Sequence, residues 1–181
     1  MNLFIGKIEV TQGDITQQRV DATVNAANES LLPGGGVSGA IHRAAGLGLQ
    51  EECIKLKWCD EGEAKITKGY NLPSKFVIHT VGPVWEGGKY NEDIILAECY
   101  RNCFNYVNKY DIKTIAFPSI STGSYGFPVE RAANIALSES IRFLQKNLSL
   151  EKIIFVCFDA KTYEAYSKAL EDMNLEDVNG S

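Results

Sequence analysis

The pattern of apolar and polar positions predicts strands that alternate with helices. From Leu3 to Val10 apolar and polar residues alternate, which is typical of a strand with one face in water. From Pro128 to Gln145 the apolar residues share one side of a helix, and proline suits its first position. Similar patterns predict strands at Ala22–Ala27, Ala64–Tyr70, Phe76–Val81, Thr114–Phe117 and Ile153–Phe158, and helices at Ser38–Ala45, Leu49–Lys57, Asn91–Lys109 and Ala160–Met173.

This order of elements predicts the fold class. Strands interleaved with helices require crossover connections, so we expect an α/β fold whose mixed, mostly parallel sheet is covered on both faces. The first strand is expected to add an antiparallel edge. We expect one domain over residues 1–173, followed by a polar tail, residues 174–181, that frays. Ligands of such sheets bind beyond the carboxyl ends of the strands, here the loops after Ala27, Phe117 and Phe158.

Composition and charge exclude several classes of protein. The 181 residues are 45% hydrophobic and 23% charged, which is ordinary for one globular domain. The net charge is −5 and the basic residues are scattered, so broad nucleic-acid binding is not expected. The longest strongly apolar run, Ile153–Phe158, is too short to cross a membrane, and the N-terminus has no signal-peptide pattern. We therefore expect a cytoplasmic protein without membrane contact.

The five cysteines do not predict a metal site or a disulfide framework. Their number is odd and no pair has CxxC spacing, so free thiols in a reducing compartment are the simpler interpretation. Cys99 and Cys103 are four residues apart, and packing of one helix face explains that spacing better than metal ligation does. No metal is predicted.

The loop after Ala27 is the first candidate for binding chemistry. Its glycines, Gly34, Gly35 and Gly36, lack Cβ atoms and allow a ligand to approach the backbone amides. They precede a helix whose first N–H groups are free and carry partial positive charge. This is an anion cradle without a basic side chain; the alternative is a flexible turn with Ser38 as an ordinary N-cap.

A dinucleotide fingerprint, G-x-G-x-x-G, is matched by Gly34, Gly36 and Gly39. Its context argues against that interpretation. The fingerprint requires a second strand that ends in an acidic residue about 20 positions later. The acids near that distance, Asp60 and Glu61, follow a helical pattern instead.

The loop after Phe117 has the same character. It holds the hydroxyl groups of Ser121, Thr122 and Ser124 and the rings of Tyr125 and Phe127, and it leads directly into the helix at Pro128. One such loop is weak support for a ligand site. Two loops that both follow parallel strands indicate opposite walls of one phosphate-binding cleft.

Four polar residues have two open interpretations each. Asp14 can accept a proton from an amine of a ligand or cap a turn, and the cap is favoured. Ser38 and His42 are four residues apart on the predicted helix, so both can face the cleft, yet no third member of a triad is evident. Ser38 fits a helix cap better than a nucleophile, and His42 fits a buried histidine equally well. His79 lies in an apolar strand and is interpreted as a hydrogen-bonded core residue.

Taken together, these motifs resemble those of the macrodomains, and the MacroD-type branch most. That branch includes bacterial O-acetyl-ADP-ribose deacetylases and mono-ADP-ribosyl hydrolases. The resemblance covers nearly the whole chain, from Gly13 to Asp159. It is carried by five segments in order, Gly13–Thr16, Val24–Asn28, Gly34–Gly46, His79–Pro83 and Ile120–Gly126.

The resemblance implies a three-layer α/β/α sandwich and a role for each matching residue. Asp14 is implied to bind the adenine amino group, the Ile15 amide an adenine ring nitrogen, and Phe158 the face of the adenine. Asn28 is implied to hydrogen-bond the distal ribose near the scissile bond, and Tyr125 to limit solvent access. The diphosphate and distal ribose are implied to lie between two loops, Gly34, Gly35, Gly36 and Val37 on one side and Ser121, Thr122, Gly123, Ser124, Tyr125 and Gly126 on the other.

One departure from the family pattern concerns catalysis. MacroD-type enzymes carry an aspartate, the proposed water-orienting base, in the segment that reads Val37-Ser38-Gly39 here. Serine has no useful basicity near neutral pH. The catalytic candidates are therefore Asn28, Ser38 and His42, with the phosphate of the substrate helping to orient the water.

Three hypotheses about function follow. The first is a monomeric macrodomain that hydrolyses ADP-ribose esters, namely O-acetyl-ADP-ribose or mono-ADP-ribosylated acidic side chains of proteins, without a metal or bound cofactor. The second is a reader that binds ADP-ribose and does not hydrolyse it. This hypothesis is favoured by Ser38, which stands in the segment where the family carries its aspartate. The third, a nicotinamide-dependent oxidoreductase, rests on the glycine fingerprint alone.

Overall fold

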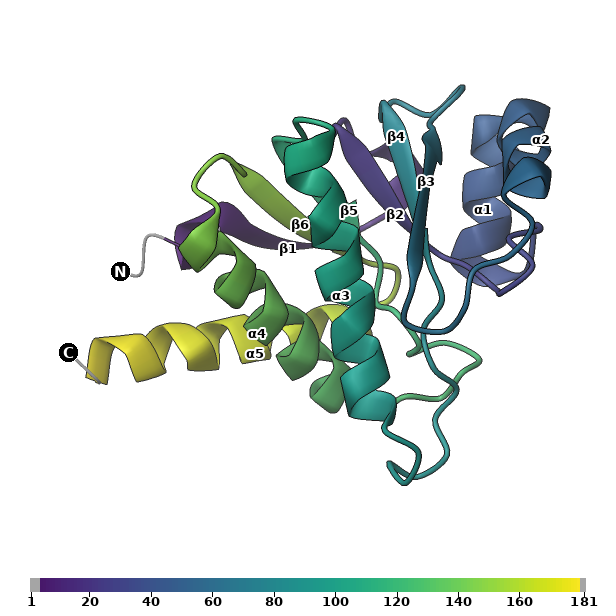
Figure 1. Ribbon diagram of the computed structural model, residues 1–181. Coiled ribbons are helices and arrows are strands. Elements are labelled where there is room, and N and C mark those ends of the chain that lie inside the picture. The colour runs from purple at the N-terminus through teal and green to yellow at the C-terminus, as the bar shows by residue number, and fades with distance from the viewer. Residues whose placement is uncertain (1–3, 180–181) are drawn as a thin grey trace.

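The computed structural model describes the backbone of residues 4–179 and the side chains of residues 4–176. Within these residues six strands form one sheet between two layers of helices (Figure 1). The strands are β1 (Ile8–Gln12), β2 (Ala22–Ala26), β3 (Ala64–Lys68), β4 (Phe76–Thr80), β5 (Thr114–Phe117) and β6 (Lys152–Cys157). The helices are α1 (Gly36–Ala45), α2 (Leu47–Leu56), α3 (Glu92–Lys109), α4 (Val129–Lys146) and α5 (Ala160–Asn179), with short 3-10 turns η1 (Ile5–Lys7) and η2 (Ile15–Gln17).

The sheet has the order β1-β6-β5-β2-β4-β3, and all neighbouring pairs except β3 and β4 are parallel. The predicted mixed, mostly parallel sheet is confirmed. The predicted place of the antiparallel edge is wrong, because β1 runs parallel to β6 and β3 is the antiparallel strand. A hairpin between β3 and β4 needs only a short connection, whereas β1 pairs with the last strand of the chain.

Alternate residues of the strands enter two separate cores. In β6, Ile153 and Phe155 belong to the core beneath α3, α4 and α5, while Ile154 and Val156 belong to the core beneath α1 and α2. A parallel strand that is buried on both faces reads as the continuous apolar run seen here. The three-layer architecture is thus confirmed (Figure 1).

Several element boundaries differ from the sequence prediction. The first strand begins at Ile8, after the turn η1, and Leu3 lies outside the described residues. Helix α1 begins at Gly36, two residues before the predicted start. Pro128 is the residue before α4 rather than its first residue. Helix α5 continues to Asn179, beyond the predicted helix end at Met173.

The parallel strands bring five loops to one edge of the sheet. Because β1, β6, β5, β2 and β4 run in the same direction, the segments after Gln12, Cys157, Phe117, Ala26 and Thr80 all leave the sheet there. The loops that the sequence singles out therefore lie on one side of the molecule.

Candidate functional site

At one end of this edge, the segment that carries an exposed aromatic residue is joined to the segment that carries a carboxylate. The N–H of Gly13 donates to the carbonyl of Cys157 at 2.9 Å, which joins the segment after β1 to the segment after β6. Phe158 follows immediately and is 83% exposed, an unusual state for a large apolar side chain. Asp14 accepts hydrogen bonds at Oδ1 from the N–H and hydroxyl of Thr16 and caps η2. The predicted cap is confirmed, and the side chain of Phe158 is free to contact a ligand.

The glycine loop lies directly against the start of α1. Gly35 is the N-cap residue without a side-chain hydrogen bond, and Gly36 opens the helix with φ +56°. The prediction of Ser38 as the N-cap is therefore wrong, because it is the third helical residue. The first N–H groups of a helix lack intrahelical acceptors, so those of Gly36 and Val37 are available to an anion.

Asn28 and Ser38 are held by the same loop. The Asn28 amide donates to the carbonyl of Leu32 at 3.0 Å and accepts from the Ser30 hydroxyl at 2.7 Å. Ser38 is 5% exposed, and its Oγ accepts from the N–H of Gly34 at 3.4 Å. The carboxamide is thus oriented before any ligand arrives, while the serine hydroxyl contacts the backbone of the loop.

Of the two interpretations of His42, the structure shows the buried histidine. Its side chain is 6% exposed, and its ring centre lies 6.4 Å from that of His79, between α1 and the sheet. Burial lowers the pKa of His42. A position four residues after Ser38 shares its side of the helix, but that side of α1 is turned toward the core.

His79 is a hydrogen-bonded core residue, as predicted. Its Nδ1 lies 3.2 Å from the amide nitrogen of Asn25, and its Nε2 lies 2.9 Å from the hydroxyl of Thr67. Burial, and then the nearby His42, lower its pKa to about 3. Both histidines are therefore neutral near pH 7.

The loop after β5 is rigid despite its small residues. The Ser119 and Thr122 hydroxyls are 2.6 Å apart, and the N–H of Gly126 donates to the carbonyl of Gly123 at 3.0 Å. Ser121 has φ +66°, a strained conformation for a residue with a side chain. Loops held in this way present their backbone amides in one arrangement, as a binding site requires.

The loop after β4 supports this second loop through a contact that the sequence analysis did not predict. The N–H of Trp85 donates to the carbonyl of Tyr125 at 2.8 Å, and the indole ring centre lies 4.8 Å from that of Phe127. A Cβ on Gly82 would lie 2.1 Å from the Ser121 hydroxyl, so the two loops touch there as well. Neither periodicity nor a local motif predicts such contacts.

The electrostatics of the edge favour binding through the backbone. None of the predicted site residues is lysine or arginine. Burial, together with nearby Glu29 and Glu86, raises the pKa of Glu61, so these carboxylates lie close enough to repel one another. Amides and hydroxyl groups can hold an anion here without a cationic side chain.

The rest of the described structure shows no competing centre. Within residues 4–176, no three His, Cys, Asp or Glu side chains are arranged to hold a metal ion. All five cysteines are unpaired and buried, as predicted. None of the described helices is long and apolar enough to span a membrane. A groove of about 470 Å³ between β3 and α3 contains none of the predicted site residues.

Comparison with known proteins points to one family. The family model described as "Macro domain" matches residues 24–136. A "Macro domain-containing protein" of Methanosarcina mazei is 58% identical over 94% of this chain and 91% of its own length. "O-acetyl-ADP-ribose deacetylase 1" of Pantoea vagans is 51% identical over 91% of this chain and 98% of its own length.

The comparison with solved structures agrees. A glycine-to-valine variant of the Oceanobacillus iheyensis macrodomain with ADPR (ADP-ribose) superposes with a TM-score of 0.86 and 43% identity. The match covers 92% of each chain. The similarity extends over both helical layers and the sheet that carries the five loops.

Proposed function

Because this chain belongs to the Macro domain family, we propose that it binds ADP-ribose and hydrolyses ADP-ribose esters. The substrates would be O-acetyl-ADP-ribose or mono-ADP-ribosylated Asp and Glu side chains of proteins. The relative named as a deacetylase and the structural neighbour with ADP-ribose support this choice. We further propose that the protein acts as a cytoplasmic monomer without a metal or bound cofactor.

The observation that carries the proposal is that two candidate binding loops follow neighbouring parallel strands and leave the sheet at the same edge. In our proposal the amides at the start of α1, Gly34–Val37, form one wall of the site, and the loop Ser121–Gly126 forms the other. A pyrophosphate between them would accept hydrogen bonds from both walls. The exposed ring of Phe158 and the carboxylate of Asp14 lie at the end where an adenine would be read.

The reaction is addition of water to an ester, which yields a carboxylic acid and a ribose hydroxyl. In our proposal Asn28 hydrogen-bonds the distal ribose and fixes the ester relative to the attacking water. Neither Ser38 nor the buried, neutral His42 is placed to take the proton of that water. A phosphate oxygen of the substrate then orients the water, and His42 supports the loop from beneath. Loss of one acid–base group slows such a reaction by about 10²–10⁴-fold, so a slow enzyme is expected.

The test measures release of ADP-ribose from a mono-ADP-ribosylated protein and release of acetate from O-acetyl-ADP-ribose. The Asn28→Ala variant removes a hydrogen bond to the ribose and should lower the rate by about 10–100-fold. Glu164→Gln on α5 serves as a matched control, because its exposed side chain lies outside all five loops. No release by the wild type, or equal release by wild type and Asn28→Ala, would contradict the catalytic proposal.

A second candidate function, a reader without hydrolysis, is favoured by Ser38. Its hydroxyl is buried and engaged with the N–H of Gly34, so the loop carries no base. A reader binds ADP-ribose in calorimetry and gives no product in the assay. Hydrolysis that begins only in the Ser38→Asp variant would favour the reader, whereas turnover by the wild type would eliminate it. A nicotinamide-dependent oxidoreductase would instead bind NAD much more tightly than ADP-ribose.

A further inference from the structure

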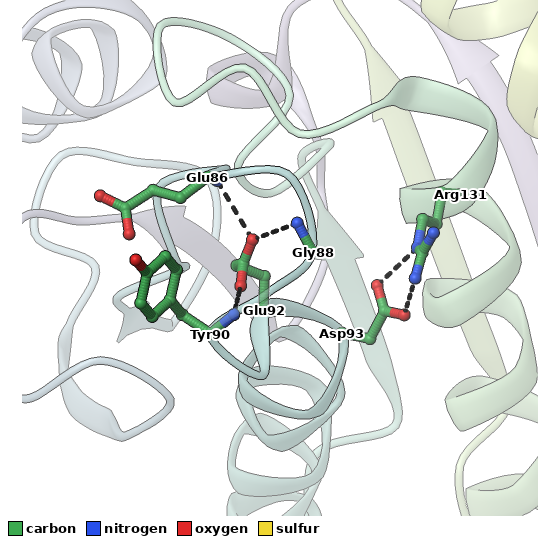
Figure 2. Close-up of polar contacts among 6 residues, drawn as sticks. All are labelled: Glu86, Gly88, Tyr90, Glu92, Asp93 and Arg131. Atoms are coloured by element: carbon green, nitrogen blue, oxygen red, sulfur yellow. Dashed lines mark hydrogen bonds and ion pairs between the residues drawn. The ribbon is translucent and has the colours of Figure 1, made fainter.

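A buried carboxylate at the start of α3 organises the loop after β4. Glu92 is 2% exposed, and Oε2 accepts hydrogen bonds from the N–H groups of Glu86 (3.1 Å) and Gly88 (2.7 Å) (Figure 2). Oε1 accepts from the N–H of Tyr90 (Figure 2). Burial alone would raise the pKa of Glu92, but these backbone donors outweigh it and lower the pKa below its ordinary value. The carboxylate is therefore charged and encircled by amides of one loop.

This loop, residues 83–91, packs through its tryptophan. A Cβ on Gly88 would lie 3.1 Å from the indole of Trp85, so the backbone that Glu92 holds lies directly on that ring. The backbone N–H of Trp85 in turn donates to the carbonyl of Tyr125 at 2.8 Å. The contacts of Glu92 thus continue, through one residue, to the loop assigned to the diphosphate and distal ribose.

A second contact fixes the same tryptophan from the side of α4. The guanidinium carbon of Arg131 lies 5.3 Å from the centre of the Trp85 ring. Arg131 also makes a two-pronged ion pair with Asp93, the residue after Glu92 (Figure 2). The start of α3 therefore holds the arginine of α4 that lies against Trp85.

We infer that Glu92 is a positioning residue for ligand binding and that it acts through Trp85 on Tyr125 and the Ser121–Gly126 loop. The inference rests on the proposed function, because that function places the diphosphate and distal ribose against this loop. A charged carboxylate is required, since two oxygens must accept three N–H groups. Glutamine has one acceptor oxygen, and its NH₂ group would face amide donors.

The experiment compares ADP-ribose with AMP in calorimetry. AMP lacks the distal ribose and the second phosphate, so it depends mainly on the adenine end of the site. Glu92→Gln should weaken ADP-ribose binding by about tenfold, the loss expected when a charge-assisted hydrogen bond is disrupted. The Kd for AMP should change by less than about twofold, because AMP does not reach the loop that Glu92 positions. Glu98→Gln, which changes an exposed carboxylate on the same helix, is the matched control and should bind both ligands as the wild type does.

Tryptophan emission gives a readout that a purely structural role would not move. The chain has two tryptophans, Trp58 and Trp85, so Trp58→Phe leaves Trp85 as the reporter. In that background ADP-ribose should change the emission of Trp85, and the change should be lost in Glu92→Gln. AMP should leave the emission unchanged in both proteins.

The outcomes separate this inference from the proposed function. If the wild type does not bind ADP-ribose, the proposed function fails, and this inference fails with it before any variant is made. If the wild type binds and folded Glu92→Gln binds equally well, or loses both ligands to the same degree, only the positioning role is refuted. Should Glu92→Gln not fold, Arg131→Gln replaces it, because its side chain is half exposed. That variant should lose about threefold in ADP-ribose affinity, as a partly solvated contact does, and none for AMP; equal binding refutes the inference.

Discussion

The substitution Gly39→Ala can raise or lower the stability of the protein, and the contact between the glycine loop and α1 decides which. Gly39 lies inside the helix, where alanine is ordinarily favoured over glycine by about 1 kcal/mol. The added Cβ, however, would lie 2.5 Å from the carbonyl oxygen of Gly34. That oxygen belongs to the backbone of the candidate site, so it can move only if the loop moves.

The magnitudes favour the clash over the propensity. A normal carbon–oxygen contact is roughly 0.8 Å longer than the one that alanine would create, so the loop must shift by about that distance. Overpacking of this kind costs about 1–3 kcal/mol, which exceeds the gain of about 1 kcal/mol from helix propensity. We expect a net loss of about 1 kcal/mol, or a fall of about 2–4 °C in Tm for a protein of this size.

Calorimetry and thermal denaturation check this reasoning together. Displacement of the Gly34–Val37 amides should weaken ADP-ribose binding by about tenfold or more, because misplacement by about 1 Å is costly at a preorganised site. Ala44→Gly, at an exposed position of the same helix, measures the propensity contribution by itself. A Gly39→Ala protein that is more stable than the wild type and binds ADP-ribose equally well would refute the reasoning.

Four further predictions test other parts of the structure. Phe158→Ala should leave Tm unchanged, because the ring is 83% exposed, and should weaken ADP-ribose binding by about 1–3 kcal/mol of stacking energy, as calorimetry will show. Because the pKa of His79 is about 3 in the folded state and near 6.5 when unfolded, the unfolded chain binds more protons between these values. Stability should therefore fall as pH drops below about 6.5, and less steeply in His79→Gln, in denaturant titrations across pH. Gly82→Ala should destabilise the protein by about 1–3 kcal/mol in the same titrations, because its Cβ would meet the Ser121 hydroxyl at 2.1 Å. Added salt should not weaken ADP-ribose binding, since no predicted site residue is a cation; a steep loss in calorimetry from about 0.05 to 0.5 M salt would contradict backbone binding.

Much of the fold could be predicted because its elements are locally encoded. The run Ile153–Cys157 is apolar at every position, and a strand between two helical layers requires that. The direction of β1 could not be predicted in the same way. Alternation shows that β1 has a solvent-exposed face, but its paired residues in β6 lie 145 positions further along the chain, as in Ile8 and Ile153. Nothing local to Ile8–Gln12 distinguishes a parallel from an antiparallel neighbour.

The candidate site likewise has a part that local sequence predicts and a part that depends on distant contacts. Its glycine and hydroxyl loops could be predicted because the residues proposed to bind the ligand are also the residues that shape the turns. His42 shows the limit of helical spacing, which places it on one side with Ser38 but does not tell whether that side faces ligand or core. Trp85 and Glu92 were missed because their importance arises only when the loops after β4 and β5 are packed together.

The proposed backbone binding explains how an acidic protein can hold an acidic ligand. Amides carry no net charge, so a site made of them does not require a cationic side chain. Such a site does require a fixed backbone, because a loop that becomes ordered only on binding loses conformational entropy and this weakens the affinity. Three features restrain these loops: the burial of Leu31 in the core beneath α1 and α2, the close approach of Gly39 to the carbonyl of Gly34, and the hydrogen bonds that Glu92 accepts from the loop of Trp85. Under the proposed function, residues that do not touch the ligand thus contribute to its binding by holding the loops in place.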